Sequence, residues 1–222
     1  MKTTPMTTLK DNLQYLKLDA ILAGYEAEIA ESARKTRTPL EVFERLISME
    51  ADARYERAIQ RRLHDARLPV VKTLDQFDWT FPKKINQDLV RNLFRLQFIE
   101  EKANVVFISN TGLGKTHLAI ALAYEACRHN QSVLFTTAVD IINTLSCPPP
   151  MTSLAKLIRR YTTPAVLICD ELGYLPIDRR GADLLFQVIS ARYERGSTVF
   201  TSNRSFKDLA KTIKQHWSGI LK

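Results

Sequence analysis

Glycine, cysteine and long apolar runs are all scarce in this chain of 222 residues. Only seven glycines are present, so few positions can take a positive φ without strain. The three cysteines, Cys127, Cys147 and Cys169, share no CxxC spacing, and their odd number does not suit a disulfide framework, which favours a reducing compartment. No stretch approaches the roughly 18 apolar residues of a membrane span, and the first residues lack a secretory apolar region. We therefore expect a cytoplasmic protein with no membrane partner.

The charge of the chain is weighted towards basic residues. Lys and Arg together number 32 against 24 Asp and Glu, a formal net charge of +8, and most of the excess lies after residue 105. Hydrophobic residues make up 45% and charged residues 25%, which is typical of globular rather than disordered chains. A basic surplus favours a polyanionic partner, and nucleic acid is the most general one. The alternative is a soluble protein that is basic without such a partner.

The first 69 residues are predicted to be α-helical. Apolar residues recur at helical spacing between residues 7 and 34. Pro39 suits the first turn of a second helix, with Thr38 as its N-cap, and Pro69 marks its end. One stripe of this second helix is apolar and consists of Leu40, Phe43, Leu46, Ile47, Ala51 and Tyr55.

Three arginines share one face of the second predicted helix. Arg54, Arg57 and Arg61 are spaced three and four residues apart, so they could lie along a phosphate backbone. The same stretch also carries acidic residues, which would make it an ordinary solvated face: Glu50, Asp52, Glu56 and Asp65. The sequence leaves both interpretations open.

An irregular linker is predicted over residues 70–85, where aromatics and proline interrupt any periodicity. In it, Trp79 and Phe81 are more typical of packing residues than of a pair that stacks on bases. A helix is then predicted over residues 87–101.

Short apolar runs alternate with helical patterns in the rest of the chain, which indicates βαβ units and a parallel sheet. The predicted strands are residues 105–108, 132–136, 165–169 and 198–201. The predicted helices between them are residues 115–129, 138–145, 153–161 and 181–195. The fold class is therefore α/β, with a parallel sheet flanked by helices over residues 70–222 behind the helical region of residues 1–69.

The strongest chemical signal is the segment SNTGLGKT, which follows the first predicted strand and opens a helix. This is the context of a P-loop, whose backbone N–H groups and helix N-terminus bind phosphate, so we predict ATP and Mg²⁺ as cofactors. Lys115 would reach the β and γ phosphates, and the Thr116 hydroxyl would bind Mg²⁺. The predicted nucleotide-binding residues are Ser109, Asn110, Thr111, Gly112, Leu113, Gly114, Lys115 and Thr116.

One position departs from the usual P-loop pattern. Ser109 stands where GxxxxGK[ST] begins with glycine. Because serine disfavours a positive φ, we expect the turn to be altered there.

Polar residues follow two later strands. Asp170 and Glu171 end a hydrophobic strand about 55 residues after the P-loop, at the sheet edge that would face the phosphates. We expect Asp170 to hold Mg²⁺ and Glu171 to polarise the attacking water. Asn203 ends the next strand and would orient that water; its alternative role is to terminate the strand in a turn.

Together these segments resemble the IstB-like transposition helper ATPases, relatives of the DnaC helicase loader within the AAA+ class. The resemblance covers nearly the whole chain and is carried by TGLGKTHLAIALAYEA, DELGYLPIDRRGADLLFQVISARYERGS and TSNRSFKD. It implies an AAA+-type P-loop fold and an ATP-dependent DNA-binding protein that self-assembles on DNA and directs the transposase of the same element to its target. It also implies that the N-terminal region helps to bind DNA and to self-associate. By position, residues 112–116 match Walker A, Asp170 and Glu171 match Walker B, and Asn203 matches sensor 1.

One departure from the family concerns the C-terminus: this sequence ends soon after Asn203, whereas the family continues with a stretch that carries an arginine finger and a helical lid. Beyond Arg204 this sequence contains no arginine, so we expect a shortened or diverged C-terminus. Nucleotide binding is then a safer expectation than hydrolysis. An ATP- and DNA-binding module without turnover is the first alternative, and a DnaC-like helicase loader is the second.

Overall fold

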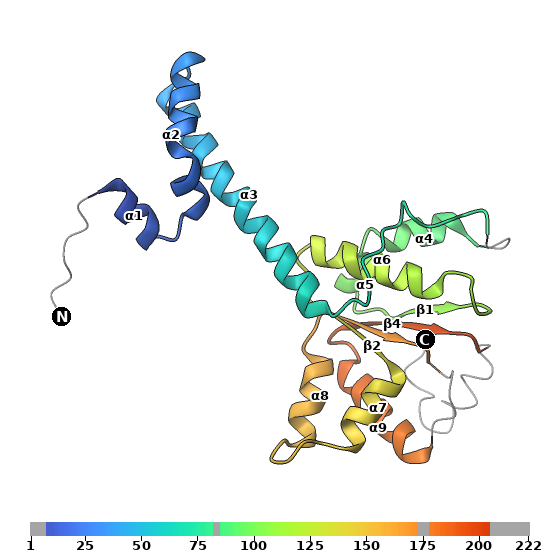
Figure 1. Cartoon of the computed structure of the whole chain (residues 1–222). Coiled ribbons are helices and arrows are strands. Elements are labelled where there is room, and N and C mark those ends of the chain that lie inside the picture. The colour runs from blue at the N-terminus through green and yellow to red at the C-terminus, as the bar shows by residue number, and fades with distance from the viewer. Residues whose placement is uncertain (1–7, 82–84, 173–177, 205–222) are drawn as a thin grey trace. The chain divides into compact units, whose positions relative to one another are not determined.

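The computed structural model describes residues 8–81, 85–172 and 178–204 (Figure 1). The chain divides into two compact units, residues 1–60 and 61–222. The division falls within helix α3 (Pro39–Ala66), before the end of the predicted helical region at residue 69.

The first unit contains α1 (Leu9–Tyr15), α2 (Asp19–Arg34) and most of α3. The helix predicted over residues 7–34 is interrupted, because Lys17 takes a positive φ of 53° between α1 and α2. The predicted cap of α3 is confirmed: the Thr38 hydroxyl accepts a hydrogen bond from the Glu41 N–H, and the Glu41 carboxylate accepts one from the Thr38 N–H at 2.7 Å.

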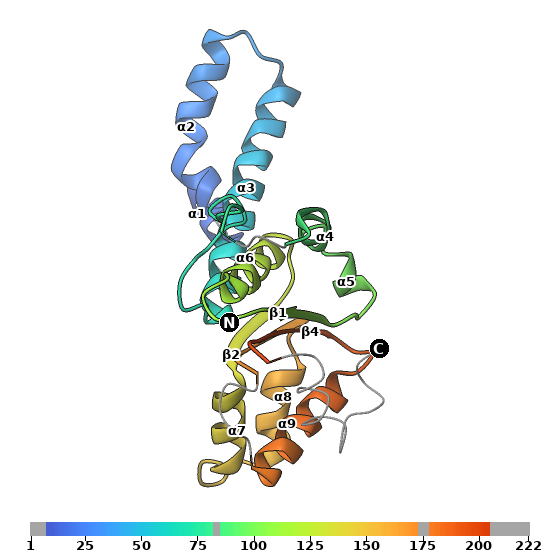
Figure 2. The same cartoon turned by 90° about the vertical axis from the view of Figure 1, so that its right-hand side faces the viewer.

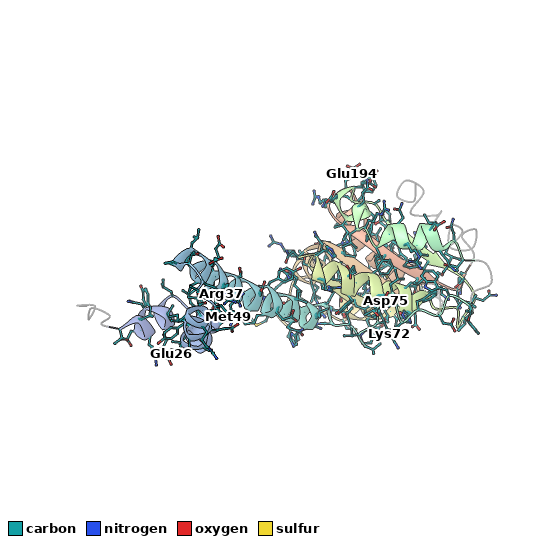
Figure 3. The ribbon with its side chains drawn as sticks, turned by 90° about the horizontal axis from the view of Figure 1, so that it is seen from above. Glu26, Arg37, Met49, Lys72, Asp75 and Glu194 are labelled. Atoms are coloured by element: carbon teal, nitrogen blue, oxygen red, sulfur yellow. The ribbon has the colours of Figure 1, made fainter. Side chains whose placement is uncertain are left out.

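Helices α2 and α3 lie side by side in both views (Figures 1 and 2). Met49 of α3 lies against Gly24 of α2, and Arg37, in the turn that joins the helices, bonds Glu28 at 2.8 Å. Figure 3 labels Met49 and Arg37 on this helix pair.

Two of the arginines on the predicted basic face are engaged within the first unit. The Glu50 carboxylate is 4% exposed and accepts hydrogen bonds from the Ala20 and Ile21 N–H groups at the start of α2. Arg54 and Arg57 each form an ion pair with Glu50, at 2.9 and 3.1 Å. Their charges therefore balance an acid that caps α2, as the interpretation with acidic neighbours expects.

The second unit is built on one parallel sheet with strand order β1-β4-β3-β2. The strands are β1 (Val105–Ile108), β2 (Val133–Thr137), β3 (Val166–Asp170) and β4 (Ser197–Ser202). Each strand lies within one residue of its predicted bounds. The predicted parallel α/β fold is confirmed.

Helices cover both faces of this sheet (Figures 1 and 2). One face is covered by α4 (Gln87–Leu93), α5 (Gln97–Glu100) and α6 (Lys115–Arg128). The other is covered by α7 (Ala138–Ser146), α8 (Leu154–Thr162) and α9 (Arg179–Arg192). The helix predicted over residues 87–101 is split into α4 and α5, because Leu96 takes a φ of 61°.

Side chains of the strands alternate between two hydrophobic cores. Val166 and Ile168 belong to the core beneath α6, whereas Leu167 and Cys169 belong to the core beneath α7 and α9. Cys169 is fully buried, as its place in an apolar run predicts, and burial raises the pKa of its thiol to about 12. The long apolar runs thus reflect burial of both faces of the sheet.

The amino ends of β3 and β4 are joined by one buried cation. Arg192 of α9 is 1% exposed, and burial lowers the pKa of its guanidinium to about 10. It donates hydrogen bonds to the Thr198 hydroxyl and to four backbone carbonyls, those of Tyr161, Pro164, Ala165 and Ser197. The charge is thus satisfied by backbone dipoles rather than by an acid.

Among the described residues, no helix is both long and apolar enough to span a lipid bilayer.

Candidate functional site

The P-loop segment connects β1 to α6. Gly112 and Gly114 take φ values of 83° and 84°, and Gly114 is the N-cap of α6. Ser109 does not take a positive φ, so serine fits there without backbone strain. The expected alteration of the turn stays a prediction. Its N–H donates to the Ser202 carbonyl at 3.3 Å, which joins the start of the loop to the end of β4.

Lys115 begins α6 and points back over its own loop. Its Nζ donates to the Asn110 carbonyl at 2.8 Å. Burial lowers the pKa of Lys115, and the nearby Asp170 carboxylate acts in the opposite direction. The ammonium group is thus held beside the loop whose N–H groups would receive phosphate.

Asp170 stands at the carboxyl end of β3 and is 5% exposed. The Thr116 hydroxyl donates to its two carboxylate oxygens at 3.0 and 3.2 Å. The Thr201 hydroxyl donates to the same carboxylate from β4. The structure therefore brings together the two predicted magnesium residues, Thr116 and Asp170, although they are 54 positions apart in sequence.

Glu171 and Asn203 follow β3 and β4 and are both exposed. Glu171 takes a φ of 60°, and its N–H donates to the Thr201 hydroxyl at 3.0 Å. Both residues line the same cavity as the P-loop. The parallel register of β3 and β4 explains this placement, because it brings their carboxyl ends to one edge of the sheet.

This cavity has a volume of about 330 Å³ and is lined by Thr111, Gly112, Gly114, Lys115, Thr116, His117, Glu171, Thr201, Ser202 and Asn203. Two other predicted site residues do not line this cavity but bond residues that do: Asp170 accepts a hydrogen bond from Thr116, and the Asn110 carbonyl accepts one from Lys115. Ser109 and Leu113 line a larger, mainly apolar cavity of about 490 Å³ along β1 and α4, which shares only Lys115 with the first. Of the two cavities, the smaller is lined by the predicted site residues Thr116, Glu171 and Asn203.

Sequence reasoning missed the contribution of the linker to this site. His117 shares a hydrogen bond of 2.9 Å with the Thr73 carbonyl, so the segment labelled by Lys72 and Asp75 in Figure 3 is tied to α6. Phe77 packs edge-on against both His117 and Trp79, with ring centroids 5.4 and 4.9 Å apart.

The predicted packing role holds for one linker aromatic and not for the other. Trp79 packs against the core beneath α6, as expected. Phe81 is 63% exposed, so the expectation that it packs is wrong. The buried aromatic is instead Phe77, which is 6% exposed, and the cluster of aromatics in the linker was its only signal in the sequence.

The family model for IstB-like ATP binding proteins matches residues 11–217. The chain belongs to this family. The ATP-binding protein of insertion sequence IS21 from Pseudomonas aeruginosa is 36% identical over 211 residues, which cover 95% of this chain and 80% of that protein. The corresponding IS5376 protein of Geobacillus stearothermophilus is 38% identical over 169 residues, which cover 76% of this chain and 67% of that protein.

Solved structures show the same fold as this IstB-like chain. A crystal structure of the DnaC helicase loader aligns with a TM-score of 0.54 at 23% identity, over 68% of this chain and 93% of that chain. DnaI aligns with a TM-score of 0.54 at 20% identity, over 68% of this chain and 81% of that one. The predicted P-loop fold of the AAA+ type is therefore confirmed.

Proposed function

We propose that this IstB-like chain binds ATP with Mg²⁺ in the 330 Å³ cavity and acts as a DNA-binding helper that directs a transposase to target DNA. The observation that carries the nucleotide site is the convergence of Lys115, Thr116 and Glu171 on one cavity at the N-terminus of α6. The names of the relatives, which are ATP-binding proteins of insertion sequences, support the wider role.

The donor set fits a magnesium ion. Hydroxyl and carboxylate oxygens are the ligands that Mg²⁺ prefers, and the Thr116 hydroxyl and the Asp170 carboxylate already lie within 3.2 Å of each other. Thr116 would bind the ion directly, and Asp170 would hold its water ligands. When bound, the ion would neutralise charge on the phosphates.

The phosphates would lie along the P-loop N–H groups, with Lys115 exchanging the Asn110 carbonyl for phosphate oxygens. Glu171 would accept a proton from the attacking water, and Asn203 would orient that water. Phosphate release measured with and without DNA, with Glu171→Gln as the blank, tests this step. Release above the blank supports a hydrolysing helper. No release with ATP binding intact supports the alternative, a module that binds ATP and DNA without turnover.

For the DNA contact we propose α8. Lys156, Arg159 and Arg160 are exposed on this helix, and none of them forms an ion pair with any residue that the structure describes. By contrast, Arg54 and Arg57 already pair with Glu50. Cations without acidic partners neutralise phosphate at a lower cost in desolvation and rearrangement.

Salt-dependent DNA binding tests this assignment. Replacing Lys156, Arg159 or Arg160 by Ala should weaken binding to all DNA sequences alike. The plot of the logarithm of the binding constant against the logarithm of the salt concentration should become less steep by about 1 for each lost contact. Arg95→Ala, which removes an exposed cation after α4, is the matched control. An unchanged slope in the α8 variants would show that α8 does not contact DNA.

The proposed partner is the transposase of the same element, and the proposed active form is a homo-oligomer assembled on DNA with ATP. With DNA and a transposase as its partners, the protein is proposed to act in the cytoplasm. Co-purification with that transposase, and ATP-dependent assembly on DNA in sedimentation, are the expected results. Capture of a replicative helicase without the transposase would favour the alternative of a helicase loader.

A further inference from the structure

One hydroxyl group lies between the two acids of the site. Thr201 of β4 is 1% exposed, its Oγ1 donates to Asp170 Oδ1, and the same oxygen accepts the Glu171 N–H at 3.0 Å. A hydroxyl carries one proton and two lone pairs, so it can make both bonds at once. A valine or alanine at this position could make neither.

The bond to Asp170 affects how that carboxylate faces Thr116. Oδ1 of Asp170 accepts from both Thr116 and Thr201, which approach from α6 and β4. With two donors on one oxygen, the carboxylate has little freedom to rotate. Its orientation towards Thr116 is therefore set in part by β4.

The bond to Glu171 supports an unfavourable backbone. Glu171 takes a φ of 60°, a left-handed conformation that side chains with a β-carbon adopt rarely. Three hydrogen bonds from residues of β4 hold this turn. The Thr201 hydroxyl accepts from the Glu171 N–H, and the Thr201 carbonyl accepts from the Leu172 N–H at 2.8 Å. The Ser202 hydroxyl donates to the Leu172 carbonyl at 2.6 Å. Only the first of these uses the Thr201 side chain.

We propose that Thr201 is a positioning residue that fixes both acids, Asp170 for Mg²⁺ and Glu171 for water. The proposal rests on the proposed function, since it assigns Mg²⁺ to Asp170. Outer partners of metal-binding groups set metal affinity by about 10- to 100-fold. Removal of the hydroxyl should therefore weaken Mg²⁺ binding and loosen the Glu171 turn together.

Four variants of the full chain separate positioning from plain stability. Thr201→Val and Thr201→Ala remove the hydroxyl, and the second serves if the first does not fold. Thr201→Ser keeps the hydroxyl. Thr198→Val is the matched control, because Thr198 lies on the same strand, is also 1% exposed and bonds Arg192 rather than the site.

Two readouts are needed. The first is hydrogen exchange of the Glu171 amide in the nucleotide-free chain, which should speed up by about tenfold or more in Thr201→Val and Thr201→Ala and stay near wild type in the other two variants. The second is the Mg²⁺ concentration at half-saturation in the binding of a fluorescent ATP analogue, which should rise by about tenfold in the same two variants.

Either of two results would overturn the proposal: Thr198→Val matching Thr201→Val in both readouts, or Thr201→Ser behaving like Thr201→Val. Failure of the proposed function gives a different pattern. A wild-type chain that binds no ATP with Mg²⁺ would overturn the proposed function and the metal half of this proposal, whereas unchanged Glu171 exchange in Thr201→Val and Thr201→Ala would overturn the positioning role by itself.

Discussion

The ring of Phe77 lies so close to Gly114 that a β-carbon on the glycine would stand 2.5 Å from Phe77 Cε2. Gly114 also takes a φ of 84°. Two independent constraints, one of backbone and one of packing, thus require glycine at the N-cap of α6.

Gly114→Ala should therefore destabilise the chain more than Gly112→Ala. Both alanines meet the cost of a positive φ, about 1–2 kcal/mol, but nothing lies within 4 Å of a β-carbon at Gly112. At Gly114 the clash with a buried ring should add about 1–3 kcal/mol to the loss. Urea unfolding of the two variants measures the difference. Equal losses of unfolding free energy would mean that the Phe77 ring moves aside without cost.

Arg192→Met should cost about 3 kcal/mol or more of unfolding free energy. The substitution removes one hydrogen bond from each of four backbone carbonyls at the amino ends of β3 and β4. Two of these bonds, to Tyr161 and Ser197, are buried, and unsatisfied buried groups cost about 1–3 kcal/mol each. Arg195→Met, at an exposed position, is the control and should change stability by less than about 0.5 kcal/mol. Similar midpoints for the two variants in urea would show that the carbonyls find other partners.

The first unit should lose stability in acid through Glu50. Burial raises the pKa of this carboxyl, but hydrogen bonds from Arg54 and from the Ala20 and Ile21 N–H groups outweigh burial, so the pKa in the folded state is lowered. The stabilisation is complete above the ordinary pKa of a glutamate, about 4.3, and is lost as pH falls through the lower folded value.

Amide exchange at the start of α2 between pH 3 and pH 6, corrected for its intrinsic pH dependence, measures this effect. Protection should fall towards the acid end in the wild type. Glu50→Gln should have low protection throughout and a much flatter profile, because an amide cannot bond Arg54 and Arg57 as a carboxylate does. A wild-type profile without this acid loss would contradict the role of Glu50.

The strands and the P-loop were predictable because their signals are local. Apolar runs such as residues 166–169 report burial on both faces of a sheet, and Lys115 and Thr116 sit in a short contiguous motif. The helix interruptions at Lys17 and Leu96 were not predictable from the sequence, because the apolar pattern continues through both positions although the backbone there takes a positive φ.

The missed contacts depend on residues far apart in sequence. Thr201 meets Asp170 across 31 positions, and His117 meets Thr73 across 44. Arg192 was equally hidden, since a charged residue near a helix end predicts a solvated side chain rather than a fully buried one. Residues 205–222, where we expected a shortened C-terminus, lie outside the described part of the chain.

The measurement that tests the central claim most directly is calorimetric titration of ATP with Mg²⁺ into the wild-type chain, Lys115→Ala and Glu171→Gln. Lys115→Ala should lose at least about tenfold in affinity, since hydrogen bonds to charged groups contribute about 1.5–3 kcal/mol. Glu171→Gln should bind ATP as the wild type does, because Glu171 is assigned to water rather than to phosphate. If Lys115→Ala bound ATP as tightly as the wild-type chain, the cavity at the N-terminus of α6 would not be the nucleotide site.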